Sequence, residues 1–346
     1  MLKEFKYNSR RFLRNITTAI AVVQLGIWSC ATAATTTIEL PKAEQAAGTP
    51  FEIKQVKAGV LNVGYAEVGP ANGQVVLLIH GWPYDINSFS EVAPLLAAKG
   101  YRVIMPYLRG YGTTRFLSDK TMRNGQQAAI AEDMIAFMDA LKIDKAIIGG
   151  FDWGARTAVI IAALWPERCK ALVSVSGYIV VNLESNQKPL SPVAEYGWWY
   201  QYYFATDRGK AGYAENTNEF NKLIWKLASP KWNFDDTTYA RSAVAFNNPD
   251  HVAIVIHNYR WRLLLAQGEA KYDKLEKRLA ERPDITVPTI TISSDFDGAA
   301  ADGKAYANKF KGKYSHKILK GIGHNVPQED PQSFANAIIE VDGYSK

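Results

Sequence analysis

The sequence predicts an α/β protein built on a doubly wound, mostly parallel sheet with an inserted helical cap. Three observations carry this prediction. Apolar runs typical of strands alternate with helical patterns over most of the chain, the run "QVVLLIHG" (74–81) is continuously apolar, and the alternation stops between residues 178 and 284. A continuously apolar strand is buried on both faces, as in a parallel sheet whose helices cover both sides.

The elements of the sheet follow in chain order. Residues 51–69 alternate between apolar and polar positions on either side of Gly59, which predicts an antiparallel hairpin. Strands are then expected at 74–81, 101–107, 145–150 and 169–177, and the intervening helices at 89–100, 126–143 and 155–166. Strands that alternate with helices in this way form a parallel sheet.

Residues 178–284 have helical patterns and are dense in tyrosine and tryptophan, which predicts a helical cap, or lid, inserted between two strands. After this segment, strands are expected at 285–295 and 315–323, and helices at 299–310 and 331–341. The core domain that contains the sheet is therefore expected to consist of residues 34–177 and 285–346.

The first 33 residues have the pattern of a secretory signal peptide. Basic residues dominate positions 1–14, the stretch from Ile16 to Ile27 is mostly apolar, and Ala31-Thr32-Ala33 is a small-residue cleavage site. We expect a mature chain that begins near Ala34 and is exported to the bacterial periplasm or secreted. An apolar run of this length is too short to span a bilayer comfortably, so no stable membrane association is expected after cleavage.

Removal of the signal changes the charge balance and the cysteine count. The signal holds five basic residues and one acidic residue, so about +2 of the formal net charge of +6 remains. A net charge this small does not indicate a nucleic-acid-binding protein. Cys30 leaves with the signal and Cys169 remains alone, which excludes an intramolecular disulfide. The sequence contains no phosphate loop, nucleotide fingerprint or metal-ligand cluster, so we expect no cofactor and no metal.

Four motifs carry the chemistry, and each follows a predicted strand. They are "HGWP" (80–83), "GFDWG" (150–154), "SSDFDG" (293–298) and "GIGHNVP" (321–327). Because ligands bind at the carboxyl ends of parallel strands, the four motifs are expected to meet. Their order of oxyanion loop, nucleophile, acid and histidine is that of α/β-hydrolases, with Asp152 where the nucleophile turn usually has serine.

With these motifs the chain resembles the epoxide hydrolase and haloalkane dehalogenase branch of the α/β-hydrolases over essentially all of residues 50–346. That branch uses an aspartate nucleophile in an "HG-x-P … D-W-G" framework, so the resemblance implies Asp152 in this role. A carboxylate can attack the sp³ carbon of an epoxide or alkyl halide and form an alkyl ester. Attack on an ordinary ester would give an anhydride, which disfavours esterase or protease activity.

The resemblance also implies the residues that cleave this ester. His324 is expected to activate water as a general base, held in its tautomer by a carboxylate. Asp297 is the expected carboxylate. Asp295, two residues closer to the strand, and Glu184, after the preceding strand, remain alternatives.

Other groups near the motifs are expected to support the reaction or the scaffold. The backbone N–H groups of Trp82 and Trp153 are expected to form the oxyanion hole. Arg109, in a loop that resembles the branch's Arg-Gly loop, and His80 are expected to be structural. The remaining histidines have no motif around them and are expected to be satisfied surface or core residues: His251, His257 and His316.

Two tyrosines favour an epoxide over a halide. Tyr200 in "WWYQYYF" (198–204) and Tyr259 in "HNYRWRL" (257–263) resemble the lid tyrosines of epoxide hydrolases, which donate to the ring oxygen. A tyrosine stays protonated at neutral pH and can give a proton to the developing alkoxide. The expected activity is hydrolysis of a small apolar or aromatic epoxide to a diol.

Two alternatives remain open. A haloalkane dehalogenase would use the same nucleophile, acid and base, with halide-facing N–H groups from Trp153 and one of Trp82, Trp198 or Trp199. A secreted binding protein on this fold would need none of the three catalytic positions to be filled. The sequence makes no prediction of an oligomeric state.

Overall fold

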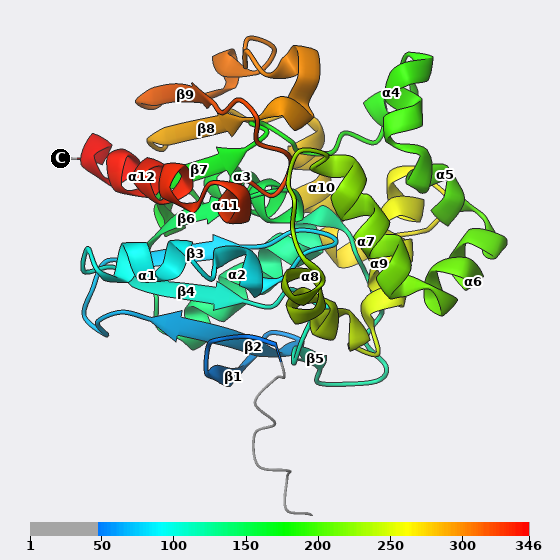
Figure 1. Ribbon diagram of the computed structural model, residues 1–346, viewed down its shortest axis with the longest axis horizontal. Coiled ribbons are helices and arrows are strands. Elements are labelled where there is room, and N and C mark those ends of the chain that lie inside the picture. The colour runs from blue at the N-terminus through cyan, green and yellow to red at the C-terminus, as the bar shows by residue number, and fades with distance from the viewer. Residues whose placement is uncertain (1–47, 346) are drawn as a thin grey trace, which may run out of the picture. The chain divides into compact units, whose positions relative to one another are not determined.

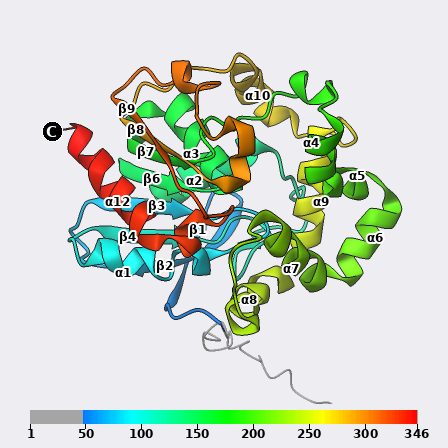
Figure 2. The ribbon, with the colours of Figure 1, turned by 45° about the horizontal axis from the view of Figure 1, so that its top comes forward.

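The computed structural model describes residues 48–345. The predicted signal peptide, its cleavage site and Cys30 lie outside the described residues. The described part contains a nine-stranded sheet (Figure 1). Helices α1 and α12 cover one face of this sheet, and α2 and α3 cover the other (Figures 1 and 2). The predicted α/β architecture with a doubly wound sheet is confirmed.

The strand order is β1-β2-β4-β3-β6-β7-β8-β9, with β5 paired to β2. The strands are β1 (Ile53–Ala58), β2 (Leu61–Val68), β3 (Val75–Ile79), β4 (Arg102–Pro106), β5 (Arg115–Phe116), β6 (Ala146–Gly150), β7 (Cys169–Val175), β8 (Thr289–Ser293) and β9 (Tyr314–Ile318). The ladders from β4 through β3 to β9 are parallel, and β2 pairs antiparallel with its neighbours. The predicted hairpin and the mostly parallel sheet are therefore both present.

Helices α1 (Val92–Ala97), α2 (Gln127–Ala140), α3 (Trp153–Leu164) and α12 (Pro331–Asp342) lie close to predicted positions. The short helix α11 (Val326–Glu329) was not predicted. Helix α3 is buried along almost its whole length because it packs against α2 and the central strands β3, β6 and β7. This burial explains the nearly unbroken apolar sequence after the "GFDWG" motif.

Residues 178–284 contain helices and no strand. The helices are α4 (Pro192–Gly197), α5 (Trp199–Ala205), α6 (Asp207–Glu215), α7 (Thr217–Ala228), α8 (Asp236–Ala243), α9 (His251–Arg262) and α10 (Asp273–Ala280). They gather on one side of the sheet, to the right in Figures 1 and 2. Their status as a separate cap domain stays a prediction. No helix in the described part of the chain combines the length and apolarity needed to cross a membrane.

The predicted helix at 299–310 is wrong. The region forms two short 3₁₀ turns, η6 (Asp295–Ala300) and η7 (Ala307–Lys309), joined by irregular backbone. Gly298 and Gly303 have φ values of 53° and 66°, a left-handed conformation that interrupts a helix. The other 3₁₀ turns are η1 (Ile86–Phe89), η2 (Pro166–Arg168), η3 (Ser185–Gln187), η4 (Val244–Asn247), η5 (Ala270–Tyr272) and η8 (Gly343–Ser345).

Candidate active site

Asp152 occupies a sharp turn between β6 and α3. Its φ of 52° and ψ of −124° lie in a region that a non-glycine residue adopts only when the surrounding structure holds it there. Close packing explains the glycines on either side. A Cβ on Gly150 would lie 2.5 Å from the carbonyl carbon of Gly154, and one on Gly154 would lie 1.8 Å from the Ile79 oxygen. The turn therefore has the strained strand-to-helix geometry of a nucleophile elbow.

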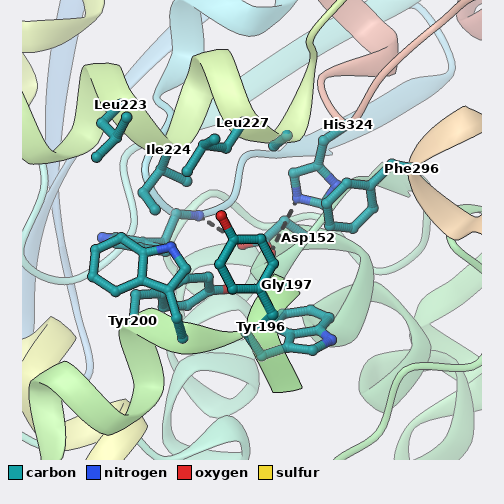
Figure 3. A pocket seen from close by; sticks show the side chains of 13 residues that line it. Asp152, Tyr196, Gly197, Tyr200, Leu223, Ile224, Leu227, Phe296 and His324 are labelled. Carbon is teal, nitrogen blue, oxygen red and sulfur yellow. Dashed lines mark hydrogen bonds and ion pairs between the residues drawn. The ribbon is translucent and has the colours of Figure 1, made fainter. Parts of the chain in front are cut away.

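Both carboxylate oxygens of Asp152 have partners from other loops. Oδ1 accepts a hydrogen bond of 2.7 Å from the backbone N–H of Trp82, and Oδ2 lies 3.4 Å from Nε2 of His324 (Figure 3). Burial opposes the charge of Asp152. The contact with His324, the nearby Arg156 guanidinium and the Trp82 N–H together outweigh burial and hold the pKa of Asp152 below its ordinary value. Asp152 is therefore a carboxylate at neutral pH.

The same contact gives Trp82 the position expected of an oxyanion donor. Its N–H already meets the oxygen that would carry negative charge if water attacked an ester on Asp152. Trp153 is the first residue of α3 and directly follows Asp152, the predicted nucleophile. Its N–H remains a predicted second donor.

His324 follows β9, and its ring lies between aromatic side chains. The Phe296 ring centroid is 4.1 Å away and the Tyr84 centroid is 5.9 Å away. The ring presents Nε2 to Asp152, whereas Nδ1 is buried and has no hydrogen-bond partner among residues 48–345. The structure therefore brings the predicted nucleophile and base together and leaves one nitrogen of the base unpaired.

None of the three candidate acids hydrogen-bonds to His324 in the described structure. Asp297 Oδ2 accepts a 2.9 Å bond from the Ser294 N–H and completes a capping box at the start of η6. Asp295 is exposed, forms a 2.6 Å ion pair with Lys231, and accepts a 3.1 Å bond from the Gly321 N–H. Glu184 is exposed at the start of η3. The role of Asp297 as the orienting acid stays a prediction.

Tyr200 and Tyr259 lie side by side although they come from α5 and α9. Their ring centroids are 5.4 Å apart, and the Trp82 ring packs 5.1 Å from Tyr200 and 5.2 Å from Tyr259. Burial raises the pKa of both tyrosines above the ordinary value, and the Asp152 carboxylate adds to this effect. Both hydroxyls therefore remain protonated at neutral pH and can act as donors.

A cavity of about 550 Å³ opens above Asp152 and His324. In Figure 3, Leu223, Ile224 and Leu227 of α7 form one wall, and Tyr200 lies opposite. Most of the remaining lining is aromatic: Trp82, Tyr196, Trp198, Trp199 and Phe296. An apolar wall with few polar groups at its floor suits an apolar ligand that reacts at one position.

The residues expected to be structural are satisfied by the scaffold. Arg109 is buried and forms a bidentate pair with Asp133, with N–O distances of 2.6 and 2.7 Å. His80 accepts a 3.1 Å bond from the Leu108 N–H, and burial lowers the pKa of His80 to about 4. The other histidines are also hydrogen-bonded: His251, His257 and His316. The structural predictions for these residues are confirmed.

The tryptophans proposed as halide donors differ in availability. The Trp82 indole N–H donates to the Tyr213 hydroxyl over 3.0 Å and is already engaged. The Trp153 indole N–H is buried and has no partner in the described part of the chain. Trp198 and Trp199 line the cavity.

Sequence reasoning missed the role of Arg156. It is buried one helical turn after Asp152 and helps to keep that carboxylate charged. Its own pKa is lowered to about 10 by burial and by the neighbouring Arg262. The sequence did contain a signal for this residue, because Arg156 is the one charged residue in the mostly apolar helix after Asp152. Arginine is seldom fully buried unless it is paired with another group.

Comparisons with known proteins agree with this geometry. The alpha/beta hydrolase fold family matches residues 74–212. Epoxide hydrolase B of Mycobacterium tuberculosis is 32% identical over 150 residues, 40% of this chain and 41% of that protein. Epoxide hydrolase 3 of Siraitia grosvenorii is 40% identical over 111 residues, 32% of this chain and 34% of that protein. The chain thus matches less than half the length of these curated relatives.

Solved structures give broader coverage. A crystal structure of a "putative epoxide hydrolase" from Klebsiella pneumoniae is 58% identical, with a TM-score of 0.83 over 87% of this chain and 100% of that one. A protein of the same description from Pseudomonas aeruginosa is 18% identical, with a TM-score of 0.72 over 86% of this chain and 98% of that one, and shows the shared fold alone. The chain belongs to the α/β-hydrolase family, among the enzymes that resemble epoxide hydrolases.

Proposed function

We propose that this enzyme hydrolyses epoxides to diols through a covalent alkyl ester on Asp152. The observation that carries the proposal is the arrangement around that carboxylate: Trp82 N–H on one oxygen and His324 on the other. The paired tyrosines beside an apolar cavity support an epoxide as the substrate. The similarity to named epoxide hydrolases supports the same activity.

The first step opens the ring. A carboxylate oxygen of Asp152 attacks one ring carbon, the bond from that carbon to the ring oxygen breaks, and the ring oxygen takes a proton from Tyr200 or Tyr259. The pKa of Asp152 is lowered and those of both tyrosines are raised, so nucleophile and acid are in the required states together. The product of this step is a hydroxyalkyl ester of Asp152.

The second step cleaves the ester. His324 takes a proton from water through Nε2, and the resulting hydroxide attacks the carboxyl carbon of Asp152. Negative charge then develops on the oxygen that faces the Trp82 N–H, and Trp153 is the proposed second donor. The bond from the carboxyl carbon to the alkyl oxygen breaks, and the alkyl oxygen takes the remaining proton of the attacking water, so that the diol leaves and Asp152 is again a carboxylate. The proton on His324 returns to the tyrosinate through solvent.

Asp297 is the proposed partner of Nδ1 in this second step. It directly follows Phe296, whose ring packs on the ring of His324, so its backbone lies on the correct loop. The role requires Asp297 to exchange its bond with Ser294 for one with Nδ1. A carboxylate in that position fixes the tautomer and stabilises the imidazolium.

A single turnover in heavy-oxygen water tests the covalent mechanism. With enzyme in excess over a small aromatic epoxide, the first diol formed should contain no solvent oxygen, and the peptide containing Asp152 should gain the label. Mass spectrometry of both products measures this. Fully labelled diol in the first turnover would mean that Asp152 only activates water.

Dehalogenation of an alkyl halide is the second candidate function. The buried indole N–H of Trp153, which follows Asp152 and has no partner within residues 48–345, favours it, because halide release requires N–H donors at the leaving group. Initial rates with matched epoxides and alkyl bromides separate the two functions. Turnover of the bromide alone would replace the first proposal, and turnover of neither would favour a binding protein.

Export and substrate size complete the proposal. We propose a periplasmic or secreted enzyme whose mature chain begins near Ala34, acting on a small apolar or aromatic epoxide. The intact mass of the protein recovered from the periplasm checks the cleavage site. A mature Cys30 carrying lipid would contradict it.

A further inference from the structure

Three consecutive backbone N–H groups around the base are held by two side chains. The Gly323 N–H donates to Glu329 Oε2 over 2.6 Å, and the Asn325 N–H donates to Glu329 Oε1 over 3.0 Å. Between them, the His324 N–H donates to Ser229 Oγ over 3.0 Å. The Ser229 hydroxyl in turn donates to Glu329 Oε1 over 2.6 Å. We call Ser229 and Glu329 the histidine clamp.

The clamp joins segments that are distant in sequence. Ser229 directly follows α7, the helix that forms one wall of the cavity, and Glu329 is the last residue of α11. The His324 N–H also approaches the Ala228 oxygen at 3.2 Å. A Cβ on Gly323 would lie 2.5 Å from Ser229 Cα, so the loop is pressed directly against the end of α7. The backbone of the base is therefore fixed by the cavity wall.

The side chain of His324 is held much less firmly by polar contacts. Its distance of 3.4 Å to Asp152 exceeds the usual range for a hydrogen bond from nitrogen, and Nδ1 has no partner within residues 48–345. Aromatic rings restrain the imidazole without fixing its height above Asp152. The position of Nε2 thus depends on where the backbone of the loop is placed.

We propose that Ser229 and Glu329 are positioning residues for His324, and that they act on cleavage of the alkyl ester and not on its formation. The inference rests on the proposed function. Ester formation needs Asp152 and the tyrosines. Asp152 keeps the Trp82 N–H and the nearby Arg156 if His324 shifts, and the tyrosines come from α5 and α9. Ester cleavage needs Nε2 to reach a water beside the carboxyl carbon of Asp152, and a misplacement of about 1 Å can cost ~10²-fold in rate.

The decisive variant is Glu329→Gln. Glutamine has one acceptor oxygen, and its amide nitrogen would face an N–H group of Gly323 or Asn325, so at least one bond of the clamp is lost. Rapid quenching followed by mass spectrometry of the Asp152 peptide measures ester formation and decay separately. We expect decay to slow by ~10- to 100-fold, whereas formation stays within about twofold of wild type. The ester should accumulate, and kcat should fall while kcat/KM stays unchanged.

Asp330→Ala provides the matched control. Asp330 follows Glu329 and also accepts a backbone N–H, that of Ser333 over 3.0 Å, at the start of α12. Its loss should lower the thermal midpoint and leave both half-reactions unchanged. Ser229→Ala is the second clamp variant and covers the case in which Glu329→Gln does not fold. It should slow ester decay by a smaller factor, because the His324 N–H keeps the Ala228 oxygen.

The outcomes separate the clamp from the proposed function. Equal losses in formation and decay, or unchanged decay in both folded clamp variants, would overturn the positioning role. A wild-type enzyme that turns over epoxide without an Asp152 ester would instead refute the covalent mechanism. Non-additive effects of Ser229→Ala and Glu329→Gln on decay would support a single unit.

Discussion

Oδ2 of Asp152 and Nε2 of His324 lie 3.4 Å apart, yet the chain holds the two residues in different ways. Asp152 is held by backbone geometry, at the end of the fully buried central strand β6 and in a turn too tight for side chains on its flanking glycines. His324 follows the edge strand β9, and the side chains of Glu329 and the distant Ser229 hold its loop. The predicted nucleophile is therefore held by the sheet and its turn, and the predicted base is held by contacts between loops. The two half-reactions should respond separately to substitution.

His324→Gln should separate the half-reactions most strongly. Removal of the base should slow ester cleavage by ~10³-fold, and alkylation of Asp152 should persist because its other contacts remain. Mass spectrometry after mixing with epoxide should detect a stable adduct on the Asp152 peptide. Rapid turnover in this variant would mean that His324 has no part in the mechanism. The contrast between ester formation by Asp152 and ester cleavage by His324 would then fail.

Combined Tyr200→Phe and Tyr259→Phe substitutions should produce the opposite defect. Without a proton donor, ester formation from an epoxide should slow by ~10²- to 10³-fold, whereas any attack on an alkyl bromide should be spared. Single-turnover rates with the two substrates measure this difference. Equal loss on both substrates would mean that the tyrosines only shape the cavity.

Asp297→Asn should affect only the step that needs His324, the cleavage of the ester. If Asp297 orients His324, ester cleavage should slow by about 10²-fold while ester formation is preserved. Asp295→Asn, two residues away on the same turn, is the control and should weaken only the exposed pair with Lys231 and the bond from the Gly321 N–H, neither of which involves the His324 side chain. A larger effect at Asp295 than at Asp297, measured as the decay of the Asp152 ester, would reverse the assignment.

Two glycine substitutions test the contrast in backbone packing. Gly154→Ala places a Cβ 1.8 Å from the Ile79 oxygen and should destabilise the fold by about 3 kcal/mol. Gly321→Ala, near the base, meets open space and should cost about 1 kcal/mol through its φ of +80°. Chemical unfolding of both variants measures the difference. Similar costs at the two positions would contradict the contrast between the tightly packed turn at Asp152 and the open position of Gly321.

The sequence predicted the sheet, the nucleophile turn and the meeting of Asp152 with His324, because each depends on local patterns at the ends of strands. It failed at residues 299–310, where Gly303 and the preceding Gly298, both with positive φ, interrupt an apparently helical composition. The capping bond of Asp297 and the histidine clamp could not be predicted. Glu329 and Ser229 are 100 residues apart, and no periodicity in the chain relates them.

The tryptophans that line the cavity should allow the proposed reaction to be followed by intrinsic fluorescence, without an added label. Trp82, Trp198 and Trp199 line the space in which the alkyl group would sit, and Trp153 follows the nucleophile. Indole emission depends on local polarity and on nearby quenching groups, so formation and loss of an ester at Asp152 should change the intrinsic fluorescence in two phases. Stopped-flow mixing of unmodified enzyme with substrate can therefore follow the intermediate in real time.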